Sequence, residues 1–594
     1  MKKFIAITAV LIFASWGCKK TFLEQPPIGS YSENVLHNGD GVKKLLVGAY
    51  TLLNGKEGLT TAPGQVLFGS IRGGEALKGS SVNDQNQMVE IQKFRVLPGN
   101  SSISEPFQWF FNGVNRANLV LKYLPSVKDL SDQEKTQITA EARFLRGHYY
   151  FMLKRLWKNL PWIDETTTDS RVPNTDASGN YVDVWPNIKA DFDFARKNLS
   201  ETNPEVGAPN KWAADAYYAK VLIYMGNEGA NTYTEALSVL NDVIANGVTN
   251  LGAKYALLPN YHDNWNAALE NGPEWVWGVQ HSVNDGTSGD NTNGSSDIEF
   301  ISPSEAPGGP TSGFGFFNPS QYFVDHFRVN NSGLPFLDGY TTNSKSVKSD
   351  YGLESADPYT IDTVALDPRL DWSVARRGIP FLDYGIFPGK SWIREQSSDG
   401  PYMSKKFFTL NKDLGKYTIV GQPQNAINIP IIRYADVLLF AAELEARIGS
   451  LDNARNYVNQ VRNRMVQNAS SPDNWVKSLD GSTNAANYKI GLYPANSPAF
   501  ADQASALHAI LFERLLELGE EGHRGYDLVR FGEADNVTDV QEFNAYINFE
   551  SKQEVYLAGA VYAKVPAMWM PIPQLAIDNS QVNGKPTLKQ NSGY

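Results

Sequence analysis

Residues 211–246 read KWAADAYYAKVLIYMGNEGANTYTEALSVLNDVIAN, and this stretch decides the fold class. Its first half places Trp212, Ala216, Ala219, Leu222 and Ile223 on one helix face. Its second half repeats such a face after the turn Gly226-Asn227-Glu228-Gly229. Apolar residues at this spacing are typical of amphipathic helices. We therefore predict two helices, over 211–226 and 232–246, that pack as a tight hairpin.

The same pattern extends outward in both directions along the chain. Apolar residues from Ile138 to Leu156 recur at helical spacing and end before Pro161. Helices return over 430–466, with a turn at Gly449, and again over 507–518. Small residues that face large ones across helical hairpins are typical of tetratricopeptide-type repeats. We predict a mainly α fold whose tetratricopeptide-like hairpins support a loop-rich body.

Residues 250–425 differ from both flanks because Gly, Pro, Asn, Asp and Ser become dense there. An insertion of this length is usually functional or disordered, and its many aromatic residues argue against disorder. The run Trp275-Val276-Trp277-Gly278-Val279 is typical of a strand or a buried segment. We expect one domain over 36–594. Its helical scaffold covers 36–250 and 430–530, its loop-rich insertion covers 250–425, and its C-terminal segment covers 531–594.

The N-terminus has the layout of a bacterial secretory signal, with Lys2 and Lys3 before an apolar run from Phe4 to Phe13. Cys18 is the chain's single cysteine and follows Gly17. A cysteine in this place is the residue that receives lipid in bacterial lipoproteins. A leftover free thiol is the alternative, because one cysteine forms no internal disulfide. We predict a signal peptide over 1–17, lipidation at Cys18 and a tether over 18–35.

The composition limits the classes of partner. The formal charge is −11, or −13 without Lys2 and Lys3, and no basic stripe is present, so we expect no nucleic-acid partner. No other stretch approaches 18 uninterrupted apolar residues. The chain holds 13 Trp, 28 Tyr and 29 Phe, and this surplus predicts either a large aromatic core or a carbohydrate-type binding surface.

Patterns for catalysis or metal binding are weak. The seven histidines never pair at His-Glu-x-x-His spacing, and Gly385-Ile-Phe-Pro-Gly389-Lys390-Ser391 lacks one residue of a phosphate loop. Glycosidase carboxylates stay open, since they lie far apart in sequence. We expect no cofactor and no metal. One acidic group could offer oxygens to calcium, but a solvated loop is the stronger interpretation of it: Asp285, Asp290, Asn291, Asn293 and Asp297. The alternating charges of Glu513–Arg530 predict an ion-pair network that ties helices together.

Several motifs, in order from Cys18 to Tyr594, resemble the SusD/RagB-type outer-membrane lipoproteins of Bacteroidetes. They are Phe22-Leu-Glu-Gln-Pro26, Glu141-Ala-Arg-Phe-Leu-Arg-Gly-His-Tyr-Tyr150, Leu366-Asp-Pro-Arg-Leu370, Pro430-Ile-Ile-Arg-Tyr-Ala-Asp-Val-Leu-Leu439, Val461-Arg462-Asn463-Arg464, Glu513–Arg530, Met570-Pro-Ile-Pro573 and Gln590-Asn-Ser-Gly-Tyr594. The resemblance implies a surface lipoprotein without enzymatic activity. Such a protein captures a nutrient, usually a glycan, for a SusC-like TonB-dependent transporter. Lys19 and Lys20 depart from the acidic residues expected in surface-exported members.

The motifs are mostly structural, so the ligand site is sought outside them. A sugar site needs exposed aromatic rings beside Asn, Asp, Gln or Arg. Two segments fit, 69–86 and 313–318, and residues near 384–394 fit less well. The candidate ligand-binding residues are Arg72, Asn83, Asp84, Phe314, Phe316, Phe317, Tyr384 and Trp392, with Arg394 beside them. A surface glycan hydrolase, a peptide-binding member of the same family and a scaffold for protein contacts remain alternatives.

Overall fold

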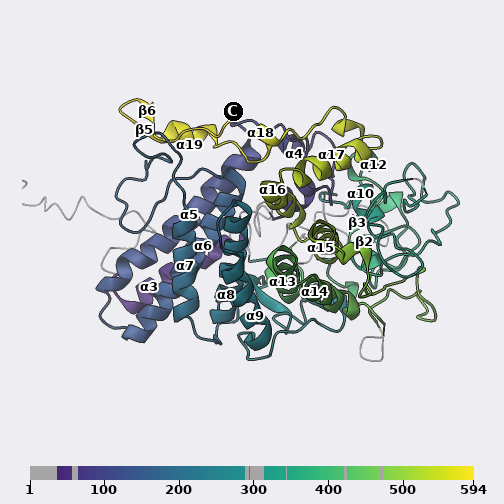
Figure 1. Cartoon of the computed structure of the whole chain (residues 1–594), viewed down its shortest axis with the longest axis horizontal. Coiled ribbons are helices and arrows are strands. Elements are labelled where there is room, and N and C mark those ends of the chain that lie inside the picture. The colour runs from purple at the N-terminus through teal and green to yellow at the C-terminus, as the bar shows by residue number, and fades with distance from the viewer. Residues whose placement is uncertain are drawn as a thin grey trace, which may run out of the picture.

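The computed structural model describes residues 36–55, 65–287, 293–294, 314–342, 344–419, 424–467 and 473–594. Cys18 and the predicted tether lie outside them. The longer helices form an array that runs through the molecule (Figure 1). They are α3 Gly39–Tyr50, α5 Ser101–Tyr123, α6 Asp132–Trp157, α7 Trp185–Asn198, α8 Lys211–Asn227, α9 Tyr233–Asn246, α13 Tyr434–Ile448, α14 Leu451–Arg464, α15 Gln503–Leu518, α16 Arg524–Asp535 and α17 Thr538–Glu550.

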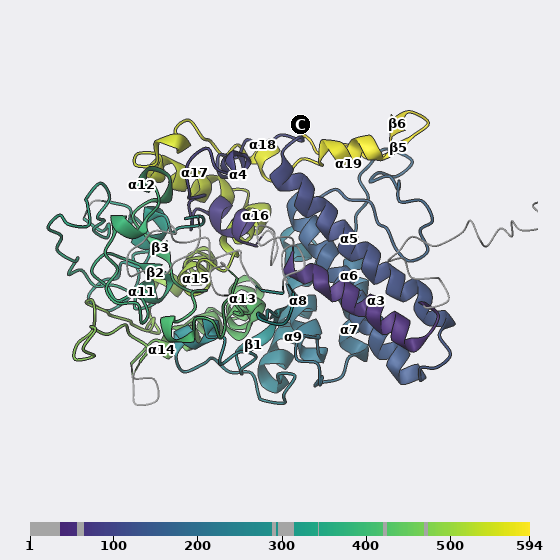
Figure 2. The same cartoon turned by 180° about the vertical axis from the view of Figure 1, so that it is seen from behind.

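Successive helices of this array pack against one another. The contacts run from α5 to α6, α7, α8 and α9, and α9 then packs against α13, although more than 180 residues separate them in sequence. Helices α14 and α15 continue from α13. Figure 2 shows α3 lying across the outside of the first helices. The predicted helices over 211–226 and 232–246 are confirmed as α8 and α9, and the mainly helical fold with tetratricopeptide-like hairpins is confirmed with them.

Local signals in the sequence set the ends of these helices. Ser131 and Glu134 form a reciprocal capping box at the start of α6. Asn210 caps α8, because its side-chain oxygen accepts a hydrogen bond from the Ala213 backbone N–H at 2.8 Å. In the same way Asn38 accepts one from Gly41 at the start of α3. These caps satisfy N–H groups that a helix leaves unpaired at its first turn.

Close approach of α5 and α6 depends on Gly113. A Cβ atom at this position would lie 2.6 Å from the ring of Tyr149 on α6. Tyr149 is fully buried, and its hydroxyl donates a hydrogen bond to the Ala49 backbone oxygen on α3 at 2.6 Å. The contact therefore fixes three helices at one point.

The loop-rich body begins and ends at a two-stranded antiparallel sheet. Strand β1, Trp275–Val279, pairs with β4, Ile429–Arg433, so that Val279 lies opposite Ile429. The expectation that helix begins at 430 was wrong by four residues, because the chain 430–433 pairs with a strand about 150 residues away. The body lies at one end of the molecule, beyond α15 (Figure 1).

The remaining elements are short. They are α4 Asn86–Gln92, α10 Gln321–Asp325, α11 Leu370–Ser373, α12 Gln396–Asp399, α18 Lys564–Ala567, α19 Gln574–Asn579, β2 Val374–Ala375 paired with β3 Met403–Ser404, and β5 Gln581–Val582 paired with β6 Lys585–Pro586. The C-terminal segment returns to the first helices, where Asn591 donates hydrogen bonds to the Trp157 and Met570 backbone oxygens, both at 2.8 Å. Among the described residues, no helix combines the length and apolarity needed to cross a membrane.

Aromatic residues fill the core between the helices. Trp212, Tyr217 and Tyr218 on α8 are buried, as their place in the repeat predicts. Tyr217 stacks on Phe192 with 4.4 Å between ring centroids. Trp277 on β1 is also buried, and its ring meets Phe144 edge-on at 4.7 Å. Much of the aromatic surplus is therefore core.

The predicted ion-pair network is confirmed and is almost completely buried. We call its centre the Glu517 network: Asp367, Arg369, Lys406, Arg433, Arg462, Arg464, Glu274, Glu513, Glu517 and Glu521. Arg433 reaches Glu274 and Glu517 at 2.7 Å each and Glu521 at 2.8 Å. Burial alone would raise the pKa of Glu517, but the neighbouring guanidinium groups outweigh it and hold that pKa well below its usual range. Glu517 therefore stays ionised, and the network joins α14 and α15 to the loop-rich body.

Candidate functional site

The two segments that the sequence singles out for ligand binding lie side by side. Leu77 donates a backbone hydrogen bond to Asn318 at 2.8 Å, and Ser80 donates one to Gly315 at 2.6 Å. Gly79 makes this pairing possible, because a Cβ atom there would lie 2.2 Å from the Gly315 oxygen, and its φ is +76°. Segments more than 230 residues apart in sequence thus form one surface.

Phe314 is the aromatic side chain that this surface presents. Its residue is 50% exposed, and no other Phe, Tyr or Trp among the described residues is exposed to this extent. Arg394 donates a hydrogen bond to the Phe314 backbone oxygen at 3.2 Å, and its guanidinium carbon lies 5.7 Å from the centre of the ring. An aromatic ring with a polar fork beside it is a suitable platform for a pyranose.

An acidic group lies next to Arg394, and an exposed amide precedes it in the sequence. Arg394 lies 3.8 Å from the Asp84 carboxylate, and Asn83 beside it is exposed. We call Asn83, Asp84, Phe314 and Arg394 the Phe314 surface. It combines an apolar ring with donors and acceptors of hydrogen bonds, which is what recognition of a hydroxylated ring requires.

Lys78 holds the loop of the Phe314 surface from beneath. Its ammonium group donates to the backbone oxygens of Ser81 at 2.5 Å and Asp84 at 2.8 Å. The Ser80 hydroxyl donates to the Asp84 carboxylate at 2.8 Å. Burial lowers the pKa of Lys78 to about 8. The loop that carries Asn83 and Asp84 is thus fixed by internal bonds.

Four of the predicted ligand residues are buried, so our prediction for them does not fit the structure. Arg72 is 1% exposed, and its guanidinium donates to the backbone oxygens of Ala567 and Met568 at 2.7 Å. Phe316 and Phe317 follow Phe314 in sequence but turn into the core. Trp392 packs edge-on against Phe387 in a smaller core cluster. These side chains stabilise the fold beneath the surface and offer no ring face to a ligand.

Tyr384 takes an intermediate position. It is half-buried, its hydroxyl donates to the Thr409 backbone oxygen at 3.1 Å, and its ring meets Phe381 and Phe408. Thr409, Phe381 and Phe408 all lie outside the Phe314 surface.

The acidic loop considered for calcium is described only in part. Asp285 accepts hydrogen bonds from the Ser282 hydroxyl at 2.6 Å and the Asn293 side chain at 2.8 Å. Asp290, Asn291 and Asp297 lie outside the described residues. Within the described ranges, no group of three or more His, Cys, Asp or Glu side chains is arranged to hold a metal ion.

Sequence reasoning missed a cavity of about 550 Å³ in the loop-rich body. Its walls come from separate segments near residues 260–267, 372, 380–383, 405–417 and 473–479. No single segment shows a motif, because the wall is divided among segments far apart in sequence, each of which contributes one to six residues. The aromatic content of the insertion was the one signal that pointed toward it.

Together, the antiparallel helical hairpins and the loop-built surface define this protein's class: a mainly helical protein with tetratricopeptide-like repeats that support a loop-rich body. The chain belongs to the SusD family, whose sequence model matches residues 273–594. A second family model, described as starch-binding associating with outer membrane, matches residues 24–223. The resemblance predicted from the motifs is confirmed.

Similar proteins span almost the whole chain. A SusD-like protein of Formosa agariphila is 24% identical over 553 residues, which make up 89% of each chain. A solved laminarin binding SusD-like protein is 22% identical with a TM-score of 0.63, covering 94% of this chain and all of that one. Surface glycan-binding protein A from Bacteroides thetaiotaomicron, solved in complex with laminarihexaose, is 18% identical with a TM-score of 0.62, covering 93% and 99%. These structural matches establish the fold.

Proposed function

We propose that this protein binds an oligo- or polysaccharide at the outer membrane and delivers it to a SusC-like TonB-dependent transporter. In this proposal residues 36–594 act as one binding domain, lipid on Cys18 anchors it, and the protein faces the cell exterior. The description of the second family model supports the outer-membrane placement. Two structural relatives, the laminarin binding SusD-like protein and the glycan-binding protein in complex with laminarihexaose, support a glycan as the ligand class.

The observation that carries the proposal is the exposed ring of Phe314 beside Arg394 and Asp84. Phe314 is the one Phe, Tyr or Trp among the described residues exposed to this extent, and an exposed ring framed by fixed polar groups is an arrangement that ligand sites use. The ring offers a face to the C–H groups of a sugar, while Arg394 and Asp84 offer a donor and an acceptor to its hydroxyls. The Phe314 surface is therefore our proposed primary binding site.

Titration of the purified chain by calorimetry with a panel of neutral hexasaccharides that includes laminarihexaose tests this proposal. We expect Phe314→Ala to weaken binding of the preferred glycan at least tenfold, about 1.4 kcal/mol, because the ring contact is lost. Phe314→Trp keeps an aromatic face and should retain binding. Leu97→Ala is the matched control, since Leu97 is an exposed apolar residue elsewhere, 70% exposed.

The outcomes separate the function from the site. Unchanged affinity in Phe314→Ala would place the binding site elsewhere. Failure of the whole glycan panel to bind would contradict the proposed function itself. Release of reducing ends during incubation with polysaccharide would favour the hydrolase alternative. Copurification with a TonB-dependent transporter from outer membranes of the native cell tests the proposed partner, and its absence in intact membranes would contradict the delivery role.

A further inference from the structure

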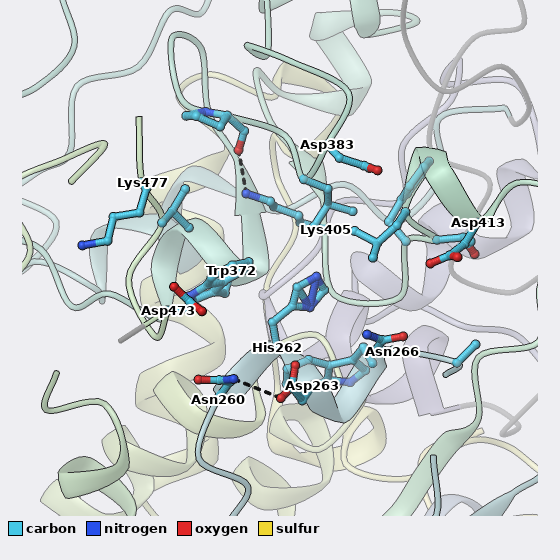
Figure 3. A pocket seen from close by; sticks show the side chains of 18 of the residues that line it. Asn260, His262, Asp263, Asn266, Trp372, Asp383, Lys405, Asp413, Asp473 and Lys477 are labelled. Carbon is cyan, nitrogen blue, oxygen red and sulfur yellow. Dashed lines mark hydrogen bonds between the residues drawn. The ribbon is translucent and has the colours of Figure 1, made fainter. Parts of the chain in front are cut away.

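A cavity in the loop-rich body lies apart from the four residues of the Phe314 surface, none of which lines it. We call it the Trp372 cavity, and Figure 3 shows its wall. Its volume of about 550 Å³ falls within the range of small-molecule sites, roughly 300–1,000 Å³. The side chains of this wall determine which ligand the cavity can hold.

Two half-buried tryptophans add aromatic surface to the wall, beside the fully buried Trp265. Trp372 and Trp475 line the cavity and are both half-buried. The indole N–H of Trp372 donates to the Asn474 backbone oxygen at 2.7 Å, and that of Trp475 donates to Met465 at 2.8 Å. Because the polar edge of each ring is bonded to the protein, only apolar ring surface remains for a ligand. The rings are also held in place by these bonds.

Buried polar atoms in the wall have no hydrogen-bond partner among the described residues. They are the side-chain oxygen of Asn260, Nδ1 of His262, Nε1 of Trp265 and the hydroxyl of Thr409. Thr409 is 4% exposed, and the His262 ring lies 4.8 Å from the Trp372 ring (Figure 3). Buried polar groups in folded proteins nearly always have a partner. Polar atoms left unpaired beside two aromatic rings suit a ligand that carries hydroxyl groups on an apolar frame.

The charge of the wall selects among such ligands. Four carboxylates line the cavity: Asp263, Asp383, Asp413 and Asp473. Lys405 also lines it but donates to the Asp371 and Pro380 backbone oxygens at 2.7 Å, and Lys477 donates to the Asn484 side chain at 2.7 Å. Both ammonium groups are thus engaged within the protein. An anionic ligand would meet net negative charge and would find no lysine free to pair with it, which opposes its binding.

His262 adds no positive charge at neutral pH. Burial, with Lys405 and Lys406 nearby, lowers its pKa to about 3. Asp383 is already bonded, since it accepts backbone hydrogen bonds from Asn411 at 2.6 Å and Lys412 at 3.0 Å. His262 and Asp383 therefore offer a ligand neither a cation nor a free carboxylate.

We propose that the Trp372 cavity is a second carbohydrate-binding site, which accepts a short stretch of a neutral oligosaccharide and excludes acidic sugars. The inference goes beyond the proposed function, because it adds a site whose residues are separate from the Phe314 surface. It assigns Trp372 and Trp475 as ring platforms and Asn260, His262 and Thr409 as hydrogen-bonding groups.

The test uses the full chain with Phe314→Ala, so that the primary site is removed. Ala267 lines the cavity, whereas Ala268 is exposed and does not. Ala267→Trp therefore fills the cavity, and Ala268→Trp is its matched control. Thr409→Val is a second variant that removes one unpaired hydroxyl while it keeps the shape of the side chain. Calorimetry with laminarihexaose, cellohexaose and maltohexaose measures neutral binding, and hexagalacturonate and a glucosamine hexamer measure charged binding.

We expect the Phe314→Ala chain to bind at least one neutral hexasaccharide. Ala267→Trp should weaken this residual binding at least tenfold, Thr409→Val should weaken it measurably, and Ala268→Trp should leave it unchanged. Hexagalacturonate should not bind. The inference is overturned if residual binding is absent, if Ala267→Trp and Thr409→Val both leave it intact, or if either charged hexamer binds as well as the neutral ones. If the wild-type chain binds glycan and the Phe314→Ala chain does not, the second site is overturned and the proposed function still stands.

Discussion

Glu550 and Glu554 are two buried carboxyl groups close together at the end of α17. Glu550 accepts backbone hydrogen bonds from Gln321 at 3.2 Å and Tyr322 at 3.0 Å, which satisfies the start of α10. Glu554 is 0% exposed. Burial raises the pKa of Glu550 to about 7, and burial together with the charge of Glu550 raises that of Glu554 to about 8. At pH values below these pKa values, both groups are mainly neutral acids in the folded chain.

The raised pKa of Glu554 gives a pH-dependent stability. Below the unfolded pKa of about 4.5 the group is neutral in both states, and its full contribution is present. As the pH rises toward 8, the unfolded chain releases a proton that the folded chain retains, so this stability is lost. We expect Glu554→Gln to be more stable than the wild type at pH 8.5, by up to a few kcal/mol at about 1.4 kcal/mol per pKa unit.

Urea unfolding from pH 4.5 to 8.5 measures this difference. It should shrink toward zero near pH 4.5. Glu201→Gln, a change at an exposed carboxylate, should follow the wild-type profile at every pH. A difference between Glu554→Gln and the wild type that stays constant with pH would show that ionisation of Glu554 is not its cause.

At the scale of elements, the crossing of α5 and α6 depends on a missing side chain. Gly113→Ala would force the Tyr149 ring to move, and with it the hydrogen bond to Ala49. We expect a loss of about 1–3 kcal/mol in the free energy of unfolding, the usual cost of overpacking a core. Thermal or urea unfolding measures it.

Gly48 on α3 is the matched control for that substitution. An added Cβ atom there would meet no atom within 4 Å. Because alanine favours helix over glycine, Gly48→Ala should leave stability unchanged or raise it by up to about 1 kcal/mol. Equal losses at both positions would contradict the role assigned to the Tyr149 contact.

Elements with local signals were predictable from the sequence, whereas elements that depend on distant pairing were not. The α8–α9 hairpin follows from its own apolar spacing and turn. The run Ile429–Arg433 forms a strand because β1 lies beside it, and nothing within the run indicates that partner. The same limit applies to the candidate site. Composition indicates segments 69–86 and 313–318 as candidates for ligand binding. It does not reveal that Phe314 is exposed while Phe316 and Phe317 are buried in the core.

At the scale of the whole molecule, the Glu517 network joins distant parts of the chain. It draws on Glu274, which directly precedes β1, and on Arg433 from β4. Arg464 from α14 and Glu517 from α15 also belong to it. Three arginines share the Glu517 carboxylate. Removal of one partner from a buried network leaves uncompensated charge, which costs far more than the net worth of the pairs.

We therefore expect Glu517→Gln to lower the free energy of unfolding by about 3–5 kcal/mol. Chemical unfolding followed by tryptophan fluorescence measures the change. Glu90→Gln is the control, because Glu90 pairs with Arg95 on the surface at 2.6 Å, and exposed pairs contribute less than about 1 kcal/mol. A loss at Glu517 as small as that at Glu90 would contradict the structural role of the network.

The pairing of Val279 with Ile429 has a consequence for how such proteins diversify. Because the loop-rich body leaves the scaffold and returns to it at neighbouring positions of one ribbon, its two ends form a natural exchange boundary. An exchange of residues 280–428, with one crossover at each end, would replace Phe314 and Arg394 while it leaves Asn83, Asp84 and the helical array in place. The incoming segment must also supply the side chains that Asp367, Arg369 and Lys406 contribute to the Glu517 network. Ligand preference would then change by exchange of a cassette, with half of the contact surface inherited from the recipient.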